Sequence, residues 1–467
     1  MLERHGVVWA WSGRQAVVGE LTFGPGYLTI EGRRTSDPRT WVGAEQLASV
    51  RRGQAAERLR DLPTLLLQVG RETLSVAPFQ TEELSQIRAQ LHDFSTLERP
   101  AAPLRLLVAG GGVAGLETAL AVHEQAHEHV ETTLLSAGRH FTYRPLMVME
   151  PFGGRAPRVS LERFADEAGA AFELGTLVAV DPSARTAMTT TRGELDYDLL
   201  VVALGATERS ALDGAFTFGT RNAGEFAQVL GEIQAGRLRR VAFVVPRGVV
   251  WALPLYELAL LTARRVRGKG NVAISLVTSE RAPLGLLGSR ASAVVGALLS
   301  EHDVQVLAGR TAVRVEPGSL VLAQGESLEV DRVVALPRLE GPYLPGLPHD
   351  AVGYLPTDRF GHVGHLSTVL AAGDATAFPI KQGGIAAQQA DVVASVVAAR
   401  AGVAVVPAPF EPVLEAQMLT ENGPLRFRAR IEVGVGEAST VSFERPSERP
   451  GKIVARRLSA YLDRHLA

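Results

Sequence analysis

The apolar run from Leu106 to Ala109 leads directly into Gly110-x-Gly112-x-x-Gly115 and then into a helical pattern. Each glycine has a physical task in such a turn. The first allows the tight bend, the second lets the backbone approach a pyrophosphate, and the third lets the helix pack closely on the strand. The N-terminus of the following helix favours a negatively charged group. The segment therefore predicts a strand-turn-helix unit that binds a dinucleotide.

The next apolar strand ends at Ser136, in the run "VETTLLSAGRHF". In dinucleotide sites an acidic residue usually lies here, about 20 residues after the glycine turn, and accepts a hydrogen bond from the ribose. A serine hydroxyl can also bind a ribose, but less strongly than a carboxylate. We therefore expect Ser136 to contact the cofactor while departing from the usual pattern.

Composition excludes several classes of function. The 467 residues suggest more than one domain, and the formal net charge of -2 gives no overall field that would attract nucleic acid. The sequence contains no cysteine, which excludes disulfides, thiolate metal sites and redox-active cysteine pairs. His123 and His127 lie four residues apart beside acidic neighbours, but this spacing reads as a solvated helix face, and we expect no metal site.

The first 96 residues differ from the rest, because short alternating runs broken by Gly and Pro indicate antiparallel strands. The segment from Thr81 to Phe94 then has Leu84, Ile87, Leu91 and Phe94 at helical spacing. A small sheet closed by one helix resembles the pleckstrin-homology-like fold, with an unclassified small barrel as the alternative. Leu97 to Arg105 reads as a linker.

The N-terminus lacks a sustained apolar region, so we expect no signal peptide and a cytoplasmic location.

From Leu106 onward, apolar strands alternate with helical stretches, which is typical of a doubly wound (Rossmann-like) α/β fold. Two later segments end strands in glycine: one reaches Gly205, and the other reaches Gly373-Asp374 before a helix of small residues. Together with the first glycine turn, their order and spacing over residues 104–400 resemble the three FAD-binding segments of the pyridine nucleotide-disulfide oxidoreductase superfamily.

This resemblance implies FAD as the cofactor. Asp374 would accept a hydrogen bond from the ribityl or pyrophosphate region, and the helix beginning near Gly383 would direct its N-terminus at the flavin pyrimidine carbonyl. A positive dipole or the charge of Lys381 there would favour the reduced flavin. The alternatives are a helix cap for Asp374 and a solvated surface position for Lys381. The cofactor contacts implied in this way are Gly110, Gly112, Val113, Ala114, Gly115, Ser136, Arg144, Pro145, Ala203, Gly205, Gly373, Asp374, Gly383 and Gly384.

The run from Arg139 to Gly154 is similar to a stretch found in the sulfide:quinone oxidoreductase, flavocytochrome c sulfide dehydrogenase and type II NADH dehydrogenase branch. There it skirts the flavin, so Tyr143, Arg144 and Pro145 become candidate neighbours of the ring; an ordinary turn is the alternative. The sulfide-oxidising members work through cysteines, which this chain lacks. Their thiol chemistry therefore cannot be carried over.

The stretch "RRVAFVVPRGVVWALPLYELALL" (Arg239 to Leu261) is too interrupted by charge for a membrane span, which needs about 20 apolar residues. It reads as a strand from Val241 to Val245, a turn, and a helix from about Leu255. The superfamily carries its NAD(P) domain at this place in the order. Only Gly248 remains in the turn, however, and Trp251, Leu253 and Pro254 add bulk where a pyrophosphate needs bare backbone.

Three residues are candidate catalytic groups: Lys381, Glu257 and Tyr143. Glu257 falls where the superfamily often keeps a glutamate near the flavin, with a helix-surface carboxylate as the alternative.

In the tail, the run "GPLRFRARIEVGVG" predicts an antiparallel pair, and the last segment predicts a basic amphipathic helix. In that helix Ile453, Val454, Leu458, Tyr461 and Leu462 would form the apolar face, and Lys452, Arg456, Arg457 and Arg464 the charged face. The apolar face would rest on a membrane surface, or pack on the flavin domain or a second subunit.

The domain organisation that follows is a mainly-β module at 1–96, an FAD domain at 104–215 and 345–405, an inserted NAD(P)-domain-like unit at 216–344, and a C-terminal region at 406–467. We expect an FAD-dependent oxidoreductase between a small-molecule donor and an acceptor such as a quinone. One alternative is an NAD(P)H dehydrogenase in which Arg247 or Arg281 holds a phosphate. The other is a non-catalytic flavin-bound interaction protein. Partner contact through the N-terminal module or the C-terminal helix, and a homodimer, also stay open.

Overall fold

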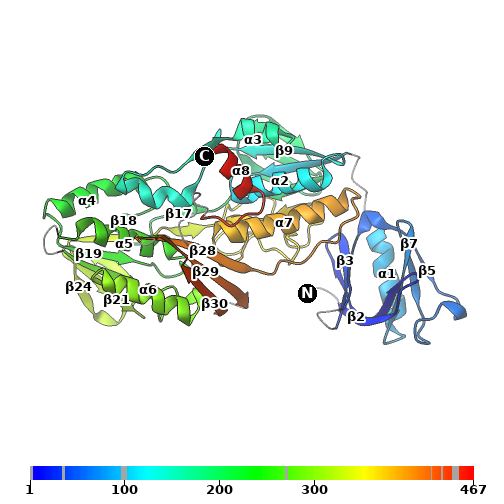
Figure 1. The fold of residues 1–467 in the computed structure, drawn as a ribbon. Coiled ribbons are helices and arrows are strands. Elements are labelled where there is room, and N and C mark those ends of the chain that lie inside the picture. The colour runs from blue at the N-terminus through cyan, green and yellow to red at the C-terminus, as the bar shows by residue number, and fades with distance from the viewer. Residues whose placement is uncertain are drawn as a thin grey trace.

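The computed structural model describes residues 4–33, 37–95, 103–268, 272–421, 423–432, 435–443 and 452–466. Figure 1 shows three parts arranged in a row, with the N-terminal sheet at one end. The middle part contains α2 (Val113–Ala126) and α7 (Gly383–Arg400), and the part at the other end contains α4 (Phe226–Gln234) and α6 (Ser289–Glu301).

The N-terminal part is an antiparallel sheet of seven strands in the order β4-β3-β2-β1-β7-β6-β5. Its strands are β1 (Arg4–Trp11), β2 (Val17–Gly24), β3 (Tyr27–Gly32), β4 (Arg39–Gly43), β5 (Leu47–Arg52), β6 (Leu65–Val69) and β7 (Glu72–Pro78). Helix α1 (Glu83–Ser95) buries Leu84, Ile87 and Leu91 in the core of this sheet, as their spacing predicts. The side chain of Phe94 and most of the expected linker lie outside the described residues. The pleckstrin-homology-like resemblance is compatible with this arrangement and stays a prediction.

The middle part, which we call the first α/β unit, has a parallel sheet in the order β12-β9-β8-β16-β27. Its strands are β8 (Leu104–Ala109), β9 (Val130–Ser136), β12 (Ala170–Leu174), β16 (Leu199–Val202) and β27 (Val369–Ala371). Leu106 and Val108 face helices α2 and α7, while Leu107 and Ala109 face the opposite side. That opposite side packs against an antiparallel sheet of β13 (Leu177–Asp181), β14 (Thr186–Thr189) and β15 (Gly193–Asp196). The sheet is therefore buried on both faces, as expected for a parallel sheet.

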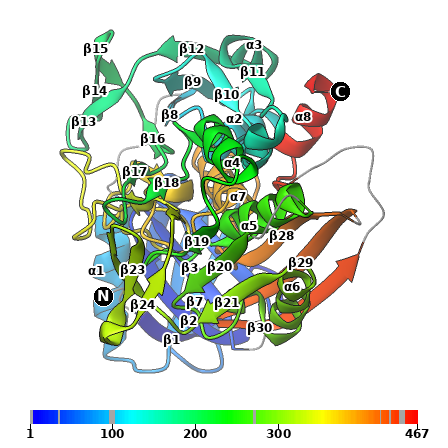
Figure 2. The ribbon, with the colours of Figure 1, turned by 90° about the vertical axis from the view of Figure 1, so that its left-hand side faces the viewer.

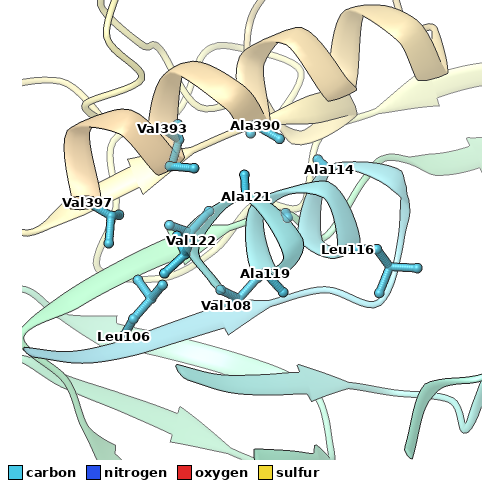
Figure 3. Close-up of a cluster of buried hydrophobic side chains, with 14 of the residues drawn as sticks. Leu106, Val108, Ala114, Leu116, Ala119, Ala121, Val122, Ala390, Val393 and Val397 are labelled. Carbon is cyan, nitrogen blue, oxygen red and sulfur yellow. The ribbon is translucent and has the colours of Figure 1, made fainter. Parts of the chain in front are cut away.

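Small residues bring α2 and α7 into close contact above this sheet. Figure 3 shows Ala114 and Ala121 of α2 on the side of α7, and Ala390 and Val393 of α7 on the side of α2. Because alanine projects little from the helix, the two backbones can approach closely. This packing fixes the beginnings of both helices next to one another.

The second α/β unit repeats this construction, with a parallel sheet in the order β18-β25-β19-β20-β21. Its strands are β18 (Phe216–Thr217), β19 (Arg240–Val244), β20 (Ala273–Thr278), β21 (Val304–Ala308) and β25 (Arg332–Ala335). Helices α4, α5 (Leu253–Val266) and α6 cover one face. An antiparallel sheet of β22 (Ala312–Glu316), β23 (Ser319–Leu322) and β24 (Ser327–Glu329) packs against the other. The two units are joined by the antiparallel pair β17 (Thr207–Arg209) and β26 (Arg338–Glu340).

The strand and helix expected within Arg239 to Leu261 are confirmed as β19 and α5, and the helix begins two residues earlier than predicted. In the part of the chain that the structure describes, no helix combines the length and apolar character needed to cross a bilayer.

Three strands rather than two form the C-terminal antiparallel sheet, so the predicted pair is incomplete. Strand β28 (Val413–Thr420) adds to β29 (Gly423–Glu432), which also pairs with β30 (Val435–Phe443). Figure 2 shows this sheet beside α5 and α6 of the second α/β unit. Leu414, Met418 and Phe427 enter the same core as those helices.

The terminal helix is shorter than predicted, since α8 spans only Leu458–His465. Leu458, Tyr461 and Leu462 are buried in the core of the first α/β unit, which favours packing on that unit over the membrane-surface alternative. Two of the other residues assigned to the faces of this helix, Val454 and Lys452, were assigned wrongly. Val454 is 48% exposed, whereas Lys452, expected on the charged face, is buried. Lys452 lies before the helix begins, so helical periodicity does not apply to it.

The remaining short elements connect these parts. They are β10 (His140–Thr142), β11 (Arg158–Ser160) and α3 (Leu161–Glu167), with the 3-10 helices η1 (Ala44–Gln46), η2 (Ala55–Glu57), η3 (Arg144–Phe152), η4 (Ala223–Glu225), η5 (Gly285–Leu287), η6 (Ala323–Gly325) and η7 (Gly373–Ala375).

The N-terminal sheet packs on the first α/β unit through Tyr27. The hydroxyl of Tyr27 donates to Asp358 Oδ2 at 2.7 Å, and the ring centroid lies 4.9 Å from those of both Phe360 and His362. The backbone N–H groups of Phe360 and His362 donate to Asp358 Oδ1 at 2.8 and 3.0 Å. Burial would raise the pKa of Asp358, but the interactions with His362 and Tyr27 and the backbone bond outweigh it and lower that pKa. The carboxylate is therefore the polar centre of this interface.

We expect Tyr27→Phe to lower the free energy of unfolding by about 1–3 kcal/mol, because it removes one hydrogen bond from a buried carboxylate. The ring contacts stay, so the loss reports the hydroxyl alone. Urea denaturation followed by tryptophan fluorescence measures it. Tyr343→Phe is the matched control, since the Tyr343 hydroxyl donates to Ala351 O at an exposed site. Equal stability of both variants would contradict the assignment.

Candidate functional site

The glycine turn after β8 leaves space that other residues would fill. Gly110 has φ +134°, and a Cβ there would lie 2.1 Å from Ala203 O. A Cβ on Gly115 would lie 1.8 Å from Gly110 O, so the close packing of α2 on β8 requires glycine. A Cβ on Gly112 would meet nothing within 4 Å, because this backbone faces open space. The turn thus forms a cradle of bare backbone that fits the pyrophosphate of a dinucleotide.

A cavity of about 1120 Å³ extends from this cradle into the second α/β unit. Most of the predicted cofactor contacts lie on its wall: Gly110, Gly112, Val113, Ala114, Ser136, Arg144, Pro145, Ala203, Gly205, Gly373, Asp374 and Gly383. Gly115 and Gly384 are not among the described lining residues, because both lie inside packed segments; a Cβ on Gly384 would come within 3.0 Å of Gln382 Oε1. The cavity is large enough for an extended cofactor and a second ligand.

Ser136 lies at the end of β9, as the sequence predicts, and its side chain faces Gly111. Its hydroxyl accepts a long hydrogen bond from the N–H of Gly138 at 3.4 Å. Ser136 is largely buried at the cavity wall. The hydroxyl is therefore placed to contact a ribose without a strong competing partner.

Asp374 and Lys381 also line the cavity. Lys381 Nζ donates to Thr376 O at 2.5 Å and lies 3.6 Å from the centre of the Tyr354 ring. Burial lowers the pKa of Lys381 to about 8, although Asp374 and Asp350 act in the opposite direction. Burial raises the pKa of Asp374, and the charges of Lys381 and Arg144 oppose this. Lys381 is only partly exposed and lines the cavity, which does not fit the solvated surface position considered for it.

Helix α7 begins at Gly383, as predicted, beside these two residues. The Gln382 side chain accepts from Ile385 N at 2.9 Å and donates to Glu415 O at 3.0 Å. Both Gln382 and Gly383 line the cavity, so the positive end of the helix dipole faces it. The cavity wall here combines the N-terminus of a helix with a lysine whose pKa burial lowers to about 8.

Tyr143 does not line the cavity within the described residues, and its side chain has a structural contact instead. Its hydroxyl accepts hydrogen bonds from the N–H groups of Lys452 and Ile453 at 2.7 and 2.8 Å. Burial raises the pKa of the Tyr143 hydroxyl. The neighbouring Arg144 and Pro145 do line the cavity, while Tyr143 holds the C-terminal segment.

Glu257 forms a buried ion pair with Lys452. Lys452 Nζ lies 2.6 Å from both carboxylate oxygens, and the two side chains are 4% and 1% exposed. The N–H of Leu419 also donates to Glu257 at 2.8 Å, and Lys452 donates to Pro145 O at 3.2 Å. Burial raises the pKa of Glu257, while the charge of Lys452 opposes this. The helix-surface interpretation of Glu257 is therefore wrong.

Sequence reasoning missed Lys452, Ile453, Ala416 and Gln417, which bring the C-terminal region into the cavity wall. Gln417 on β28 is 4% exposed, and its Oε1 accepts no hydrogen bond within the described residues. These residues follow the superfamily segments in the sequence and carry no motif. Only the alternation of buried residues along β28 could have indicated that Ala416 and Met418 face inward.

The turn after β19 also faces the cavity. Gly248 has φ +86°, and Trp251, Leu253 and Pro254 line the wall, so the bulky groups expected in this turn are on the ligand side. Arg247 lines the same wall, whereas Arg281 does not. Of the two arginines considered as phosphate ligands, Arg247 lies on the cavity wall and Arg281 does not.

No group of three His, Asp or Glu side chains capable of holding a metal ion occurs among the described residues.

Removal of either partner of the Lys452–Glu257 pair should destabilise the protein. We expect Lys452→Met and Glu257→Gln each to cost about 3–5 kcal/mol, because each leaves a buried polar or charged partner behind. The double variant should regain much of this loss, as the two changes act on one interaction. Urea midpoints of the three variants measure the coupling.

The control for that cycle is Arg163→Met, which breaks the exposed pair with Glu167. It should leave the midpoint unchanged within error. Additive effects of Lys452→Met and Glu257→Gln would show that the two residues do not act as a pair.

Comparison with known proteins places these features in a wider group. A family model described as "Pyridine nucleotide-disulphide oxidoreductase" matches residues 70–230 and 104–401. The sulfide-quinone reductase of Aquifex aeolicus (strain VF5) is 25% identical over 264 residues, which are 51% of this chain and 59% of that protein. The chain thus spans about three fifths of the length of the curated relative that it matches.

Solved structures show the same fold. The sulfide:quinone oxidoreductase from the hyperthermophilic bacterium Aquifex aeolicus is similar with a TM-score of 0.67 at 19% identity, covering 78% of this chain and 89% of that chain. The NAD-dependent persulfide reductase from A. fulgidus is similar with a TM-score of 0.52 at 18% identity, covering 71% of this chain and 65% of that chain.

Proposed function

Since the chain belongs to the pyridine nucleotide-disulphide oxidoreductase family, whose members are FAD-binding flavoproteins, we propose that it is an FAD-dependent oxidoreductase acting between a small-molecule donor and a quinone. The observation that carries this proposal is the continuous cavity that joins the glycine cradle to a wall built by α7, β28 and Lys452. Bound FAD would supply the electron transfer. The sequence contains no cysteine, so the side chains around the cavity bind, orient and adjust charge.

The cradle residues would hold the pyrophosphate, and Ser136 would contact the ribose. Asp374 would accept a hydrogen bond from the ribityl or pyrophosphate region. Lys381 and the N-terminus of α7 would place positive charge at the ring, which favours added electrons on it. In this assignment Lys381 adjusts the charge of the site, while Glu257 and Tyr143 hold the wall in place.

The wall formed by the C-terminal region suits a quinone acceptor. Ile453 of this region supplies apolar surface together with Met147 and Val148 of η3 and Phe378 before α7. Gln417 presents a buried carbonyl oxygen without a hydrogen-bond partner among the described residues. A buried acceptor of this kind is unfavourable unless a ligand donates to it. The hydroxyl of a reduced quinone is such a donor.

An anaerobic titration of the FAD-loaded protein tests this function. We expect the visible flavin absorbance to persist with NADH and NADPH, to bleach with dithionite, and to return when a short-chain ubiquinone is added. Stoichiometric bleaching by NADH or NADPH would favour the dehydrogenase alternative. A dithionite-reduced flavin that ubiquinone does not reoxidise would reject the quinone as acceptor.

Lys381→Met should lower the midpoint potential of the bound flavin by about 30–60 mV at pH 7, since about 30 mV corresponds to 1.4 kcal/mol for two electrons. The pKa of Lys381 is lowered to about 8, so its charge is present below pH 8 and is lost above it. The potential of the unaltered protein should therefore fall more steeply with pH above about 8. This extra dependence should be absent in Lys381→Met.

Lys381→Arg is the control for charge, because arginine stays protonated throughout this pH range. It should keep the potential near that of the unaltered protein and remove the break near pH 8. Identical pH profiles for all three proteins would reject Lys381 as the titrating group. Spectroelectrochemical titration measures each potential.

A further inference from the structure

The cavity includes only one half of the place that a dinucleotide would occupy in the second α/β unit. Described lining residues of this unit come from 218–224, 247–257 and 336–339, after β18, β19 and β25, but none comes from 258–335. The end of β20, where a dinucleotide site holds its adenosine ribose, is therefore separated from the cavity.

At the end of β20, Glu280 is in contact with Tyr256. Glu280 follows β20, at the position of the acidic residue that usually binds the ribose. The Tyr256 hydroxyl donates to Glu280 Oε2 at 2.7 Å, and Thr278 Oγ1 donates to the same oxygen at 3.0 Å. Tyr256 belongs to α5, and its side chain is fully buried. The carboxylate thus has partners from the protein itself, and a tyrosine ring occupies the space beside it.

The half that stays open carries positive charge. Strands β18, β25 and β19 are adjacent and parallel, so the residues that follow them meet at one edge of the sheet. Arg221, Arg338 and Arg247 follow these strands in that order, and all three line the cavity. Arg338 pairs with Glu340 at 2.9 Å, whereas Arg221 and Arg247 form no ion pair within the described parts of the chain.

Apolar and planar groups line the same part of the cavity as these arginines. Phe218 follows β18, Trp251 follows β19, and Leu336 and Pro337 follow β25. The edge between β19 and β25 is also the point at which the strand order reverses, where ligands of α/β sheets usually bind. The site therefore offers guanidinium groups at its rim and a flat apolar surface beside them.

We propose that the second α/β unit binds a small organic carboxylate with a flat apolar body in place of a dinucleotide. The guanidinium groups of Arg247 and Arg221 match a carboxylate in geometry and charge, and the Trp251 ring matches the flat body. This inference rests on the proposed function in one respect, since the carboxylate would share the cavity with the FAD of that proposal. Binding itself needs no turnover and can be measured separately.

Benzoate and benzamide form the test pair, because they have nearly the same shape and only benzoate is charged. Trp251 fluorescence gives the readout: the other three tryptophans lie within residues 1–41, and the signal must disappear in Trp251→Phe. We expect benzoate to quench this fluorescence and to perturb the visible spectrum of the bound flavin. Benzamide, 5′-AMP and inorganic phosphate should each bind at least tenfold more weakly.

Arg247→Gln and Arg221→Gln should each weaken benzoate binding about tenfold, as expected for loss of one charge-assisted hydrogen bond. Arg281→Gln is the matched control, because this exposed arginine of the same unit lies off the cavity wall and should leave binding unchanged. Equal binding of benzoate and benzamide, 5′-AMP binding as tight as that of benzoate, or phosphate alone binding as tightly would each overturn the proposal.

The two proposals fail in different ways. A flavin that dithionite reduces and ubiquinone reoxidises, with no response to benzoate, would reject the carboxylate site and leave the proposed function standing. A protein that retains no FAD while benzoate still quenches Trp251 would reject the proposed function and leave the carboxylate site standing.

Discussion

The ion pair between Lys452 and Glu257 joins parts of the chain that lie far apart in sequence. Glu257 belongs to α5 of the second α/β unit, and Lys452 precedes α8 near the end of the chain. Pro145 and Leu419 add hydrogen bonds from η3 and β28. Removing two charges from water is costly, and only close geometry with satisfied hydrogen bonds offsets that cost. The pair therefore requires these four segments to keep fixed positions around the cavity.

A second set of charges holds the other end of the same C-terminal segment. Glu117 of α2 is fully buried and accepts from the N–H groups of Arg457 and Leu458 at 3.0 and 2.7 Å, where α8 begins. The Arg457 side chain also lies 2.5 Å from Asp391 of α7. A carboxylate at a helix N-terminus satisfies free N–H groups and suits the helix dipole. The segment between Lys452 and α8 is thus anchored to both α/β units, and it completes the cavity wall where the two units meet.

Features that depend on neighbours in sequence could be predicted, and those that depend on distant contacts could not. The glycine turn at Gly110 was recognisable because its spacing directly reflects local backbone geometry, whereas the start of α7 at Gly383 was placed through the resemblance to the superfamily and is confirmed by the structure. Lys452 was assigned to a solvated face, since its charge and spacing alone suggest a surface helix. Its burial depends on a carboxylate 195 residues away, which no local pattern records. Tyr143 shows the same limit, because the run around it does approach the site while its own hydroxyl binds Lys452.

The second α/β unit serves the cavity as part of its frame. Its parallel sheet, its helices and its antiparallel cover match those of the first unit, and Glu280 after β20 bonds Tyr256 of its own helix α5. The unit still provides Leu253, Pro254 and Glu257 to the cavity wall, and its helices carry the core on which β28 packs. Loss of this architecture would expose the Lys452–Glu257 pair and open the cavity to solvent. The parts of the unit that form this wall are therefore constrained by packing on both sides, whereas the end of β20 lies away from the cavity.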